Sequence, residues 1–286
     1  MASSVQQLLQ SDPHNLLLCA FVSVGIHLLQ WFLYGVINKY IRPRKSVIEV
    51  FPAPYFNIGC LAVFSFGLSV NQGAFHVRKV IITALVGAYA ARMCCFLFYR
   101  DVIRQLVGPQ PGSKLPSVDS LWLFTLPSLY VLCLPILFCN SPVAPENGIG
   151  LLEIAGSALG SFGFIVEAIA DQQKLAFKNS PKNEGKWCDV GLFKYSRHPN
   201  YFGDLCVWYG TFLISMPTLT TWLKWVAVIS PLLESVVILL IDGFPACERA
   251  QEKKYGSNPE YKKYKSSTSV LVPCPPQLYK KLVKID

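Results

Sequence analysis

The sequence has few charged residues, and it lacks both a common cysteine motif and the N-glycosylation motif. Only 15% of its 286 residues are Asp, Glu, Lys or Arg, whereas an average soluble domain is roughly a quarter charged. Its ten cysteines form no C-x-x-C pair, the spacing typical of zinc knuckles and thioredoxin-like redox sites. No Asn-x-Ser/Thr sequon lacking proline occurs either. We therefore expect no metal site and no ordinary soluble domain.

The residues that are present are mostly apolar. Hydrophobic residues make up 52% of the chain, and the mean hydropathy is +0.37. A soluble protein of this composition could not cover its surface with polar groups. Seven apolar stretches, two of them short, approach the ~20 residues that a membrane-spanning helix needs. They cover residues 16–37, 55–70, 80–99, 121–139, 149–170, 202–216 and 222–241. The sequence predicts an all-α, polytopic membrane bundle of about seven helices.

The net charge of +9 is distributed unevenly between the predicted loops. Lysine and arginine gather after the first, third and fifth stretches and in the C-terminal tail, whereas the opposite loops hold only Arg78, Lys79 and Lys224. Basic residues collect in cytoplasmic loops. The pattern therefore predicts a lumenal N-terminus and a cytosolic C-terminus. Nucleic-acid binding is not expected, because no groove-reading or base-stacking module accompanies the basic residues.

Several charged residues fall inside the predicted spans. These are Arg92, Glu153, Glu167, Asp171 and Glu234. An ionised group at the bilayer centre costs roughly 2.5–3.5 kcal/mol on insertion scales, so such residues often mark a polar cavity. The alternative is that they pair with one another and only fix helix packing. Glu167 and Asp171 are four residues apart and share one helix face, which favours a functional role for that pair.

The densest polar stretch covers residues 191–204 and leads directly into the sixth apolar stretch. Pro199 favours the first turn of a helix, and Asn200 is a candidate cap. Lys194 and Arg197 beside a helix N-terminus would favour an anion, because the helix end offers free N–H groups. Asn200 and Asp204 are four residues apart and could face one ligand. The alternative is an ordinary basic loop that enters a capped helix.

This region resembles the steroid 5-alpha-reductase-like superfamily, and it looks closest to an uncharacterised branch of membrane proteins. The resemblance rests on residues 167–173, on 196–204 and on a tail pattern between 248 and 273. It implies N-terminal transmembrane helices in 1–149 and a reductase-like transmembrane domain with a cytosolic tail in 150–286. It also implies a cytosol-facing cavity that holds NADPH, and hydride transfer to the double bond of a lipophilic steroid, polyprenol or enoyl lipid.

The resemblance also assigns roles to individual residues. Cofactor contacts are expected from Glu167, Asp171, Lys194, Arg197, His198, Asn200, Asp204, Glu248 and Arg249. Tyr89 or Tyr201 would deliver the proton as general acid, and Arg92 would keep the Tyr89 phenol acidic. The steroid reductases use an early glutamate with a tyrosine, but the second apolar stretch here contains no acid. This departure argues against a steroid as the substrate.

Two other functions remain open from the sequence. Isoprenylcysteine and phospholipid methyltransferases share a similar Arg-His-Pro turn and a late acidic helix. On that interpretation S-adenosylmethionine is the cofactor, and His198 and Glu248 contact its amino-acid part. The third possibility is a non-catalytic lipid-binding membrane protein. All three place the chain in a lipid bilayer, and the reductases of this kind point to the endoplasmic reticulum. The oligomeric state is not predicted.

Overall fold

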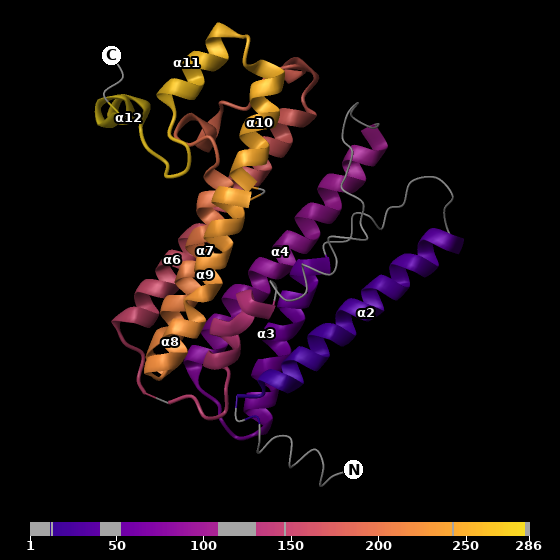
Figure 1. Cartoon of the computed structure of the whole chain (residues 1–286), viewed down its shortest axis with the longest axis vertical. Helices are drawn as coiled ribbons and strands as arrows, with labels where there is room; N and C mark the ends of the chain where they lie inside the picture. The colour runs from indigo at the N-terminus through magenta and orange to yellow at the C-terminus, as the bar shows by residue number, and fades with distance from the viewer. Residues whose placement is uncertain are drawn as a thin grey trace. The chain divides into compact units, whose positions relative to one another are not determined.

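The computed structural model describes residues 12, 14–40, 53–107, 130–145, 147–241 and 243–283. All regular elements within these ranges are helical (Figure 1). The extended pairing found there is an isolated parallel bridge between Ser196 and Ser269. The prediction of an all-α protein is therefore confirmed for the described part of the chain.

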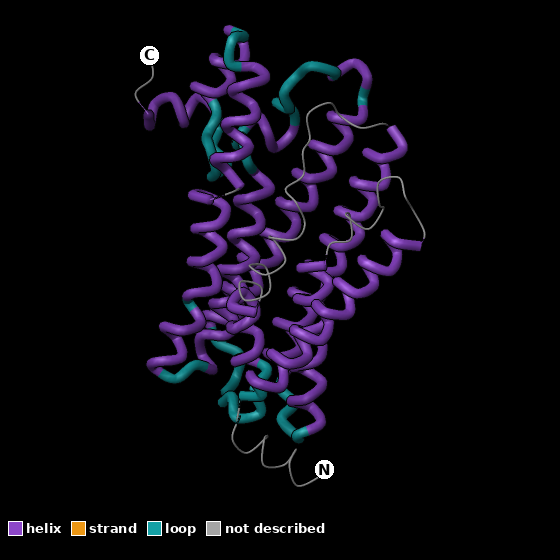
Figure 2. The backbone as a smooth tube through the Cα atoms, turned by 45° about the vertical axis from the view of Figure 1, so that its right-hand side comes forward, coloured by secondary structure: helices purple, strands orange, loops and turns teal. Residues whose placement is uncertain are grey.

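Long helices dominate the first half of the described chain, and shorter ones follow (Figure 2). The first group comprises α2 (Leu16–Tyr40), α3 (Ala53–Asn71), α4 (Val77–Val107), the helix Tyr130–Cys139 and α6 (Leu151–Asn179). The second comprises α7 (Pro199–Ser215), α8 (Thr221–Ala227), α9 (Ile229–Val236), α10 (Gly243–Tyr255), α11 (Pro259–Ser267) and α12 (Pro276–Val283). Single 3-10 turns lie at Pro181–Asn183, Gly191–Lys194 and Met216–Thr218, and a π-helical turn, Val237–Ile241, follows α9.

Among the residues that the structure describes, three helical segments are long and apolar enough to cross a membrane: Val77–Arg100, Leu151–Asn179 and Trp222–Tyr255. Two shorter apolar helices, Leu16–Gln30 and Tyr130–Cys139, accompany them. Many large apolar side chains on these segments are exposed, as lipid contact requires. The prediction of a membrane-embedded chain is confirmed. The number seven and the orientation stay predictions, and the first part of the predicted fourth span lies outside the described residues.

The chain divides into two compact units. Unit 1 comprises residues 1–157 and 211–230, and unit 2 comprises residues 158–210 and 231–286. The division falls within α6 and within α7, so each of these helices contributes to both units. The sequence-based boundary between residues 149 and 150 stays a prediction.

In unit 1, α3 packs against both α2 and α4. Asn57, the most polar residue of the predicted second span, is fully buried between α2 and α3. Its amide donates to the Ser23 carbonyl at 3.2 Å, and the Ser23 hydroxyl donates back to its oxygen at 3.2 Å. A buried amide without partners would be costly. These bonds explain how an apolar helix pair accommodates Asn57.

Two buried cations stand at the start of α4, also in unit 1. Arg78 and Glu153 form an ion pair at 2.6 Å, and each side chain is 2% exposed. Arg78 also donates to the carbonyls of Pro145, Asn147 and Gly148. Lys79 donates to the Ser69 hydroxyl and to two carbonyls. A buried charge is tolerated only with such compensation, so Glu153 serves packing, the alternative that the sequence left open.

In unit 2, α6 and α7 approach each other closely at two glycines. A Cβ atom on Gly163 would collide with the Gly203 carbonyl oxygen and the Val207 nitrogen, and one on Gly203 would collide with the backbone of Gly163 and Glu167. Small residues of this kind let two helices pack closely within a membrane. Gly163 and Gly203 therefore allow α6 and α7 to pack closely in unit 2.

The tail of unit 2 begins with α10, which ends at Tyr255 just before Gly256. The side chain of Asn258 caps α11 by accepting from the Glu260 amide at 2.8 Å, and Pro259 occupies the first turn. A cap, a proline and an early acid are the sequence signals of a helix start. The start of α11 is therefore set by neighbouring residues.

Candidate functional site

The candidate site begins at the turn that leads into α7. Gly191 starts this turn with a φ of 58°, a left-handed conformation that glycine adopts without strain. The Gln173 side chain of α6 occupies the space where a Gly191 side chain would lie, and its Oε1 accepts from the Leu192 amide at 2.8 Å. Pro199 then starts α7. The turn is thus fixed before the polar residues 196–198 are reached.

The C-terminal tail holds the same turn from the other side. The Arg197 amide donates to the Ser269 carbonyl at 2.8 Å, and the Cys274 amide donates to the Tyr195 carbonyl at 2.9 Å. Ser196 is fully buried. Its hydroxyl donates to the Leu271 carbonyl at 2.7 Å and accepts from the His198 amide at 3.1 Å. These bonds fix the backbone on which Arg197 and His198 stand.

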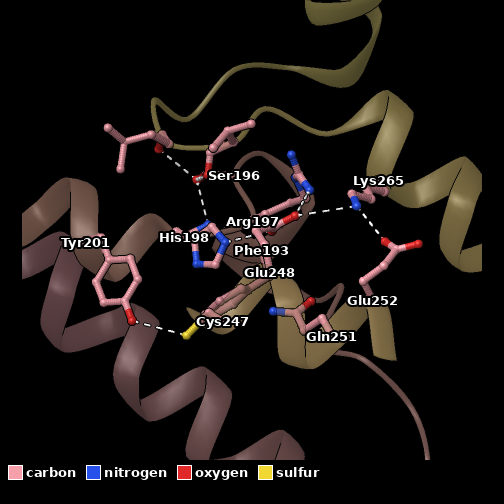
Figure 3. Close-up of polar contacts among 12 residues, drawn as sticks. Phe193, Ser196, Arg197, His198, Tyr201, Cys247, Glu248, Gln251, Glu252 and Lys265 are labelled. Carbon is pink, nitrogen blue, oxygen red and sulfur yellow. Dashed lines mark hydrogen bonds and ion pairs between the residues drawn. The ribbon is translucent and has the colours of Figure 1, made fainter. Parts of the chain in front are cut away.

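Four charged side chains and one histidine meet at this point (Figure 3). Glu248 of α10 accepts from Arg197 Nη1 at 2.5 Å through one oxygen and contacts His198 Nε2 at 2.9 Å through the other. Lys265 of α11 lies 3.9 Å from Glu248 and 2.6 Å from Glu252. We call these five residues the Glu248 cluster. The Glu248 side chain is 13% exposed, so solvent screens its interactions only in part.

His198 is the most deeply buried titratable group of the Glu248 cluster, at 1% exposure. Burial lowers the pKa of His198, and this effect outweighs the opposing effect of Glu248. The ring is therefore neutral at pH 7. Because a carboxylate only accepts hydrogen bonds, Nε2 carries the proton that faces Glu248. The ring stacks on Tyr201 at 5.4 Å between centroids, with an interplanar angle of 7°.

An aromatic group supports the Glu248 cluster from the side of the tail. It consists of Trp187, Tyr255, Tyr261 and Tyr264, whose rings lie within 6.4 Å of Trp187. The Tyr264 hydroxyl donates to the Phe193 carbonyl at 2.8 Å. Burial raises the pKa of Tyr261 to about 12, so its phenol stays protonated at physiological pH. These rings fix α10 and α11 against the turn by packing.

The structure brings four of the predicted site residues together: Arg197, His198, Tyr201 and Glu248. Tyr201 joins through its ring stacking on His198, and its hydroxyl lies 3.3 Å from the sulfur of Cys247. The predicted convergence of the Arg-His-Pro turn with the late acidic helix is therefore present in unit 2.

The remaining predicted residues of unit 2 belong to α6, α7, α10 and the turn before α7. Glu167, Asp171 and Asp204 are buried. Asp204 is hydrogen-bonded to Glu234, and the backbone of Glu167 adjoins Gly203. In contrast, Lys194 and Arg249 are exposed and take no part in the ion pairs of the Glu248 cluster. Their predicted cofactor contacts stay predictions.

Tyr89 and Arg92 belong to α4 in unit 1. The Arg92 guanidinium lies 5.9 Å from the centroid of the Tyr89 ring, as their spacing of three residues predicts. Tyr89 is fully buried, with its ring edge-on to Tyr55 at 5.9 Å. Their predicted role as an acid and its modulator in a site with Asn200 stays a prediction.

One detail of the predicted site differs in the structure. Asn200 does not cap α7, because the helix already starts at Pro199 and Asn200 lies within its first turn. Arg197 is paired with Glu248, and its predicted contact with an anion stays a prediction. Sequence reasoning also missed Ser196 and Lys265. The spacing between Lys265 and Glu252 gives no local signal, because the pair forms only after the chain reverses at Gly256.

Comparison with known proteins gives a family but no established activity. The family model described as "Protein of unknown function (DUF1295)" matches residues 36–268. A "Probable O-methyltransferase ustE" from Ustilaginoidea virens is 29% identical over 145 residues. That match covers 49% of this chain, and the chain spans about half (51%) of the length of that relative. No solved structure matches. Because the family model covers most of its length, the chain belongs to the DUF1295 family.

Proposed function

We propose that the protein is a membrane-embedded methyltransferase that uses S-adenosylmethionine and modifies a lipophilic acceptor. The observation that carries this proposal is the charge balance of the Glu248 cluster. Arg197 and Lys265 are cations, Glu248 and Glu252 are anions, and the lowered pKa of His198 keeps the imidazole neutral. The formal charges therefore cancel.

A neutral arrangement of paired charges suits a zwitterion better than a polyanion. The amino-acid part of S-adenosylmethionine carries a carboxylate beside an ammonium group, and its sulfonium is positive. Arg197 matches the carboxylate through charge-assisted hydrogen bonds, and Glu248 matches the ammonium. NADPH carries several phosphate charges, which call for a net positive site. Each cation of the Glu248 cluster already has an acidic neighbour, so the cluster offers no net positive charge for several phosphates, whereas a zwitterion needs none.

Two buried atoms support the fit further. Within the described part of the chain, Arg197 Nε is a donor and Asn200 Oδ1 an acceptor, and each is buried without a hydrogen-bond partner. Such an atom costs about 1–3 kcal/mol. Arg197 and Asn200 are three residues apart at the start of α7. A carboxylate satisfies the first atom, and an ammonium satisfies the second.

The chain's own residues then have distinct tasks in methyl transfer. When bound, S-adenosylmethionine supplies an electrophilic methyl group on its sulfonium. Arg197, Asn200 and Glu248 hold the amino-acid part, and His198 Nε2 orients Glu248 by a hydrogen bond. The apolar helices α6 and α7 offer a lipophilic acceptor access from the bilayer. The relative from Ustilaginoidea virens, named a probable O-methyltransferase, supports an oxygen nucleophile. The new C–O bond would replace the methyl C–S bond, S-adenosylhomocysteine would leave, and the hydroxyl proton would pass to solvent.

The proposal is tested by thermal stabilisation of the detergent-purified chain with S-adenosylhomocysteine and, separately, with NADPH. We expect S-adenosylhomocysteine to stabilise the wild type and Glu184→Gln, but Glu248→Gln only weakly. Glu184→Gln is the matched control, because it removes the same charge from an exposed glutamate of unit 2 that lies outside the Glu248 cluster. Stabilisation by NADPH alone would replace this proposal with the reductase described next.

An NADPH-dependent reductase is the second candidate, and one contact favours it. Gly203 lies against the Glu167 backbone, which puts the buried acids of α6 next to the helix of Asn200 and Asp204. That is the grouping expected if these residues surround a nicotinamide and its ribose in the manner of the steroid reductase-like proteins. The substrate in that case is a lipophilic enone or alkene, and the phenol of Tyr89 or Tyr201 delivers the proton.

The cellular setting belongs to the same proposal. The charge asymmetry of the loops supports a lumenal N-terminus and a cytosolic tail. The Glu248 cluster lies between the start of α7 and the tail helices, so this orientation would place it on the cytosolic side of the membrane, where the cofactor is. The endoplasmic reticulum is the expected membrane. A protease-protection assay of a C-terminal tag in sealed microsomes tests the orientation: cleavage without detergent is expected.

A further inference from the structure

The last described helix, α12, separates its side chains into two faces. Leu278 and Leu282 are four residues apart, and so are Tyr279 and Val283, which places all four on one side. Gln277, Lys280 and Lys281 occupy the other side, by the same spacing. A helix with an apolar side and a basic side is the pattern of segments that lie in a membrane interface.

The apolar face of α12 is open. Leu278 is 49% exposed and Leu282 is 69% exposed, and Val272, in the segment that leads to α12, is 57% exposed. None of the residues of α12 is buried. Contact of these exposed leucines with water is unfavourable, and insertion into a bilayer surface would remove that contact.

The direction of α12 agrees with this role. Figures 1 and 2 both show α12 running across the direction of α10, within the same unit. α10 continues the candidate membrane segment Trp222–Tyr255. A helix that crosses this direction has the orientation of one lying along a bilayer surface. Residues 276–283 also lie beyond the part matched by the family model, which ends at residue 268.

The charge of the tail selects the kind of surface. Residues 249–286 contain nine lysines and arginines but only three acids. Basic residues next to a membrane are attracted to anionic headgroups. We infer that α12 is an interfacial anchor that docks on the anionic leaflet of the bilayer in which the protein is embedded, with Leu278 and Leu282 inserted and Lys280 and Lys281 at the headgroups.

Hydrogen exchange of the full-length chain in lipid nanodiscs tests this anchor. The nanodiscs contain either phosphatidylcholine alone or phosphatidylcholine with phosphatidylserine. We expect the amides of α12 to exchange roughly tenfold more slowly in the anionic discs, since two lysines near such a surface strengthen binding by more than that factor. The difference between the two discs should disappear in Lys280→Gln/Lys281→Gln. In Leu278→Gln/Leu282→Gln, exchange should be fast in both discs.

The matched control is Lys262→Gln/Lys263→Gln, which removes the same charge from two exposed lysines of α11. This variant should keep the protection of α12. Equal exchange of α12 in both nanodiscs would overturn the anchor. A control variant that loses protection as fully as Lys280→Gln/Lys281→Gln would also overturn it, because general tail charge would then explain the result. Protection that appears only when a second protein is added would assign the face to a protein partner instead.

Discussion

Replacement of Arg78 by methionine should destabilise unit 1 strongly. Arg78 pairs with Glu153 at 2.6 Å, and both side chains are 2% exposed. In this variant the Glu153 carboxylate still accepts a hydrogen bond from the Gly150 amide, at 3.0 Å, but it has lost its bonds from Arg78. The loss of one partner from a buried ion pair costs about 3–5 kcal/mol. We expect a loss of that size in the free energy of unfolding.

The double variant Arg78→Met/Glu153→Met separates the charge effect from lost packing. It removes the stranded carboxylate, so it should recover about 2 kcal/mol or more relative to Arg78→Met. The assay is reversible unfolding of the purified chain in mixed micelles with increasing SDS, followed by circular dichroism. Lys224→Met, which removes an exposed lysine of α8, should match the wild type. A double variant as unstable as Arg78→Met would refute the reasoning, because the buried charge would not be the cause.

Three further predictions concern unit 2. Burial lowers the pKa of His198, so its contribution to stability is complete above the unfolded pKa of about 6.5 and is lost as the pH falls below it. The thermal midpoint of the wild type should therefore drop between pH 7.5 and 5.5 more than that of His198→Gln, and an equal drop would argue against a neutral buried ring. Gly163→Ala should lower the free energy of unfolding by about 1–3 kcal/mol, because the added methyl group would collide with α7. Gly87→Ala, whose methyl group would meet no other atom, should not destabilise the protein. Similar thermal midpoints of the two variants would contradict the close contact at Gly163. Asn258→Ala should destabilise α11 by about 1 kcal/mol, because it removes the cap of that helix. Hydrogen exchange should become faster in α11 alone. Unchanged exchange there would contradict the cap.

Local signals in the sequence predicted the elements and part of the site. Apolar stretches gave the helices because each helix satisfies its own backbone within a membrane. The cap at Asn258 and the proline start of α7 depend on neighbouring residues alone, so the sequence carries them directly. The Arg-His-Pro turn and Glu248 were both identified as site residues through the family resemblance.

The pairing of charges could not be predicted, because it depends on contacts between distant segments. Arg78 was interpreted as a loop charge and Glu153 as a charge inside a span, and only the fold shows that each compensates the other. The sequence assigns Arg197 to an anion because it lies beside Lys194 and a helix N-terminus, and it gives no sign of Glu248, which is 51 residues away. Lys265 reaches the Glu248 cluster only after the chain reverses between α10 and α11. Composition indicates how many charges a membrane protein holds but not which of them cancel.

The most direct measurement is the transfer of a radiolabelled methyl group from S-adenosylmethionine into organic-extractable lipid by membranes that contain the protein. Methyl transfer at the Glu248 cluster predicts label in the lipid phase with the wild type and with Glu184→Gln, and a fall of at least about tenfold with Glu248→Gln, the loss expected from a charge-assisted contact. Absence of label in the lipid phase, together with consumption of NADPH by the same membranes, would contradict the account.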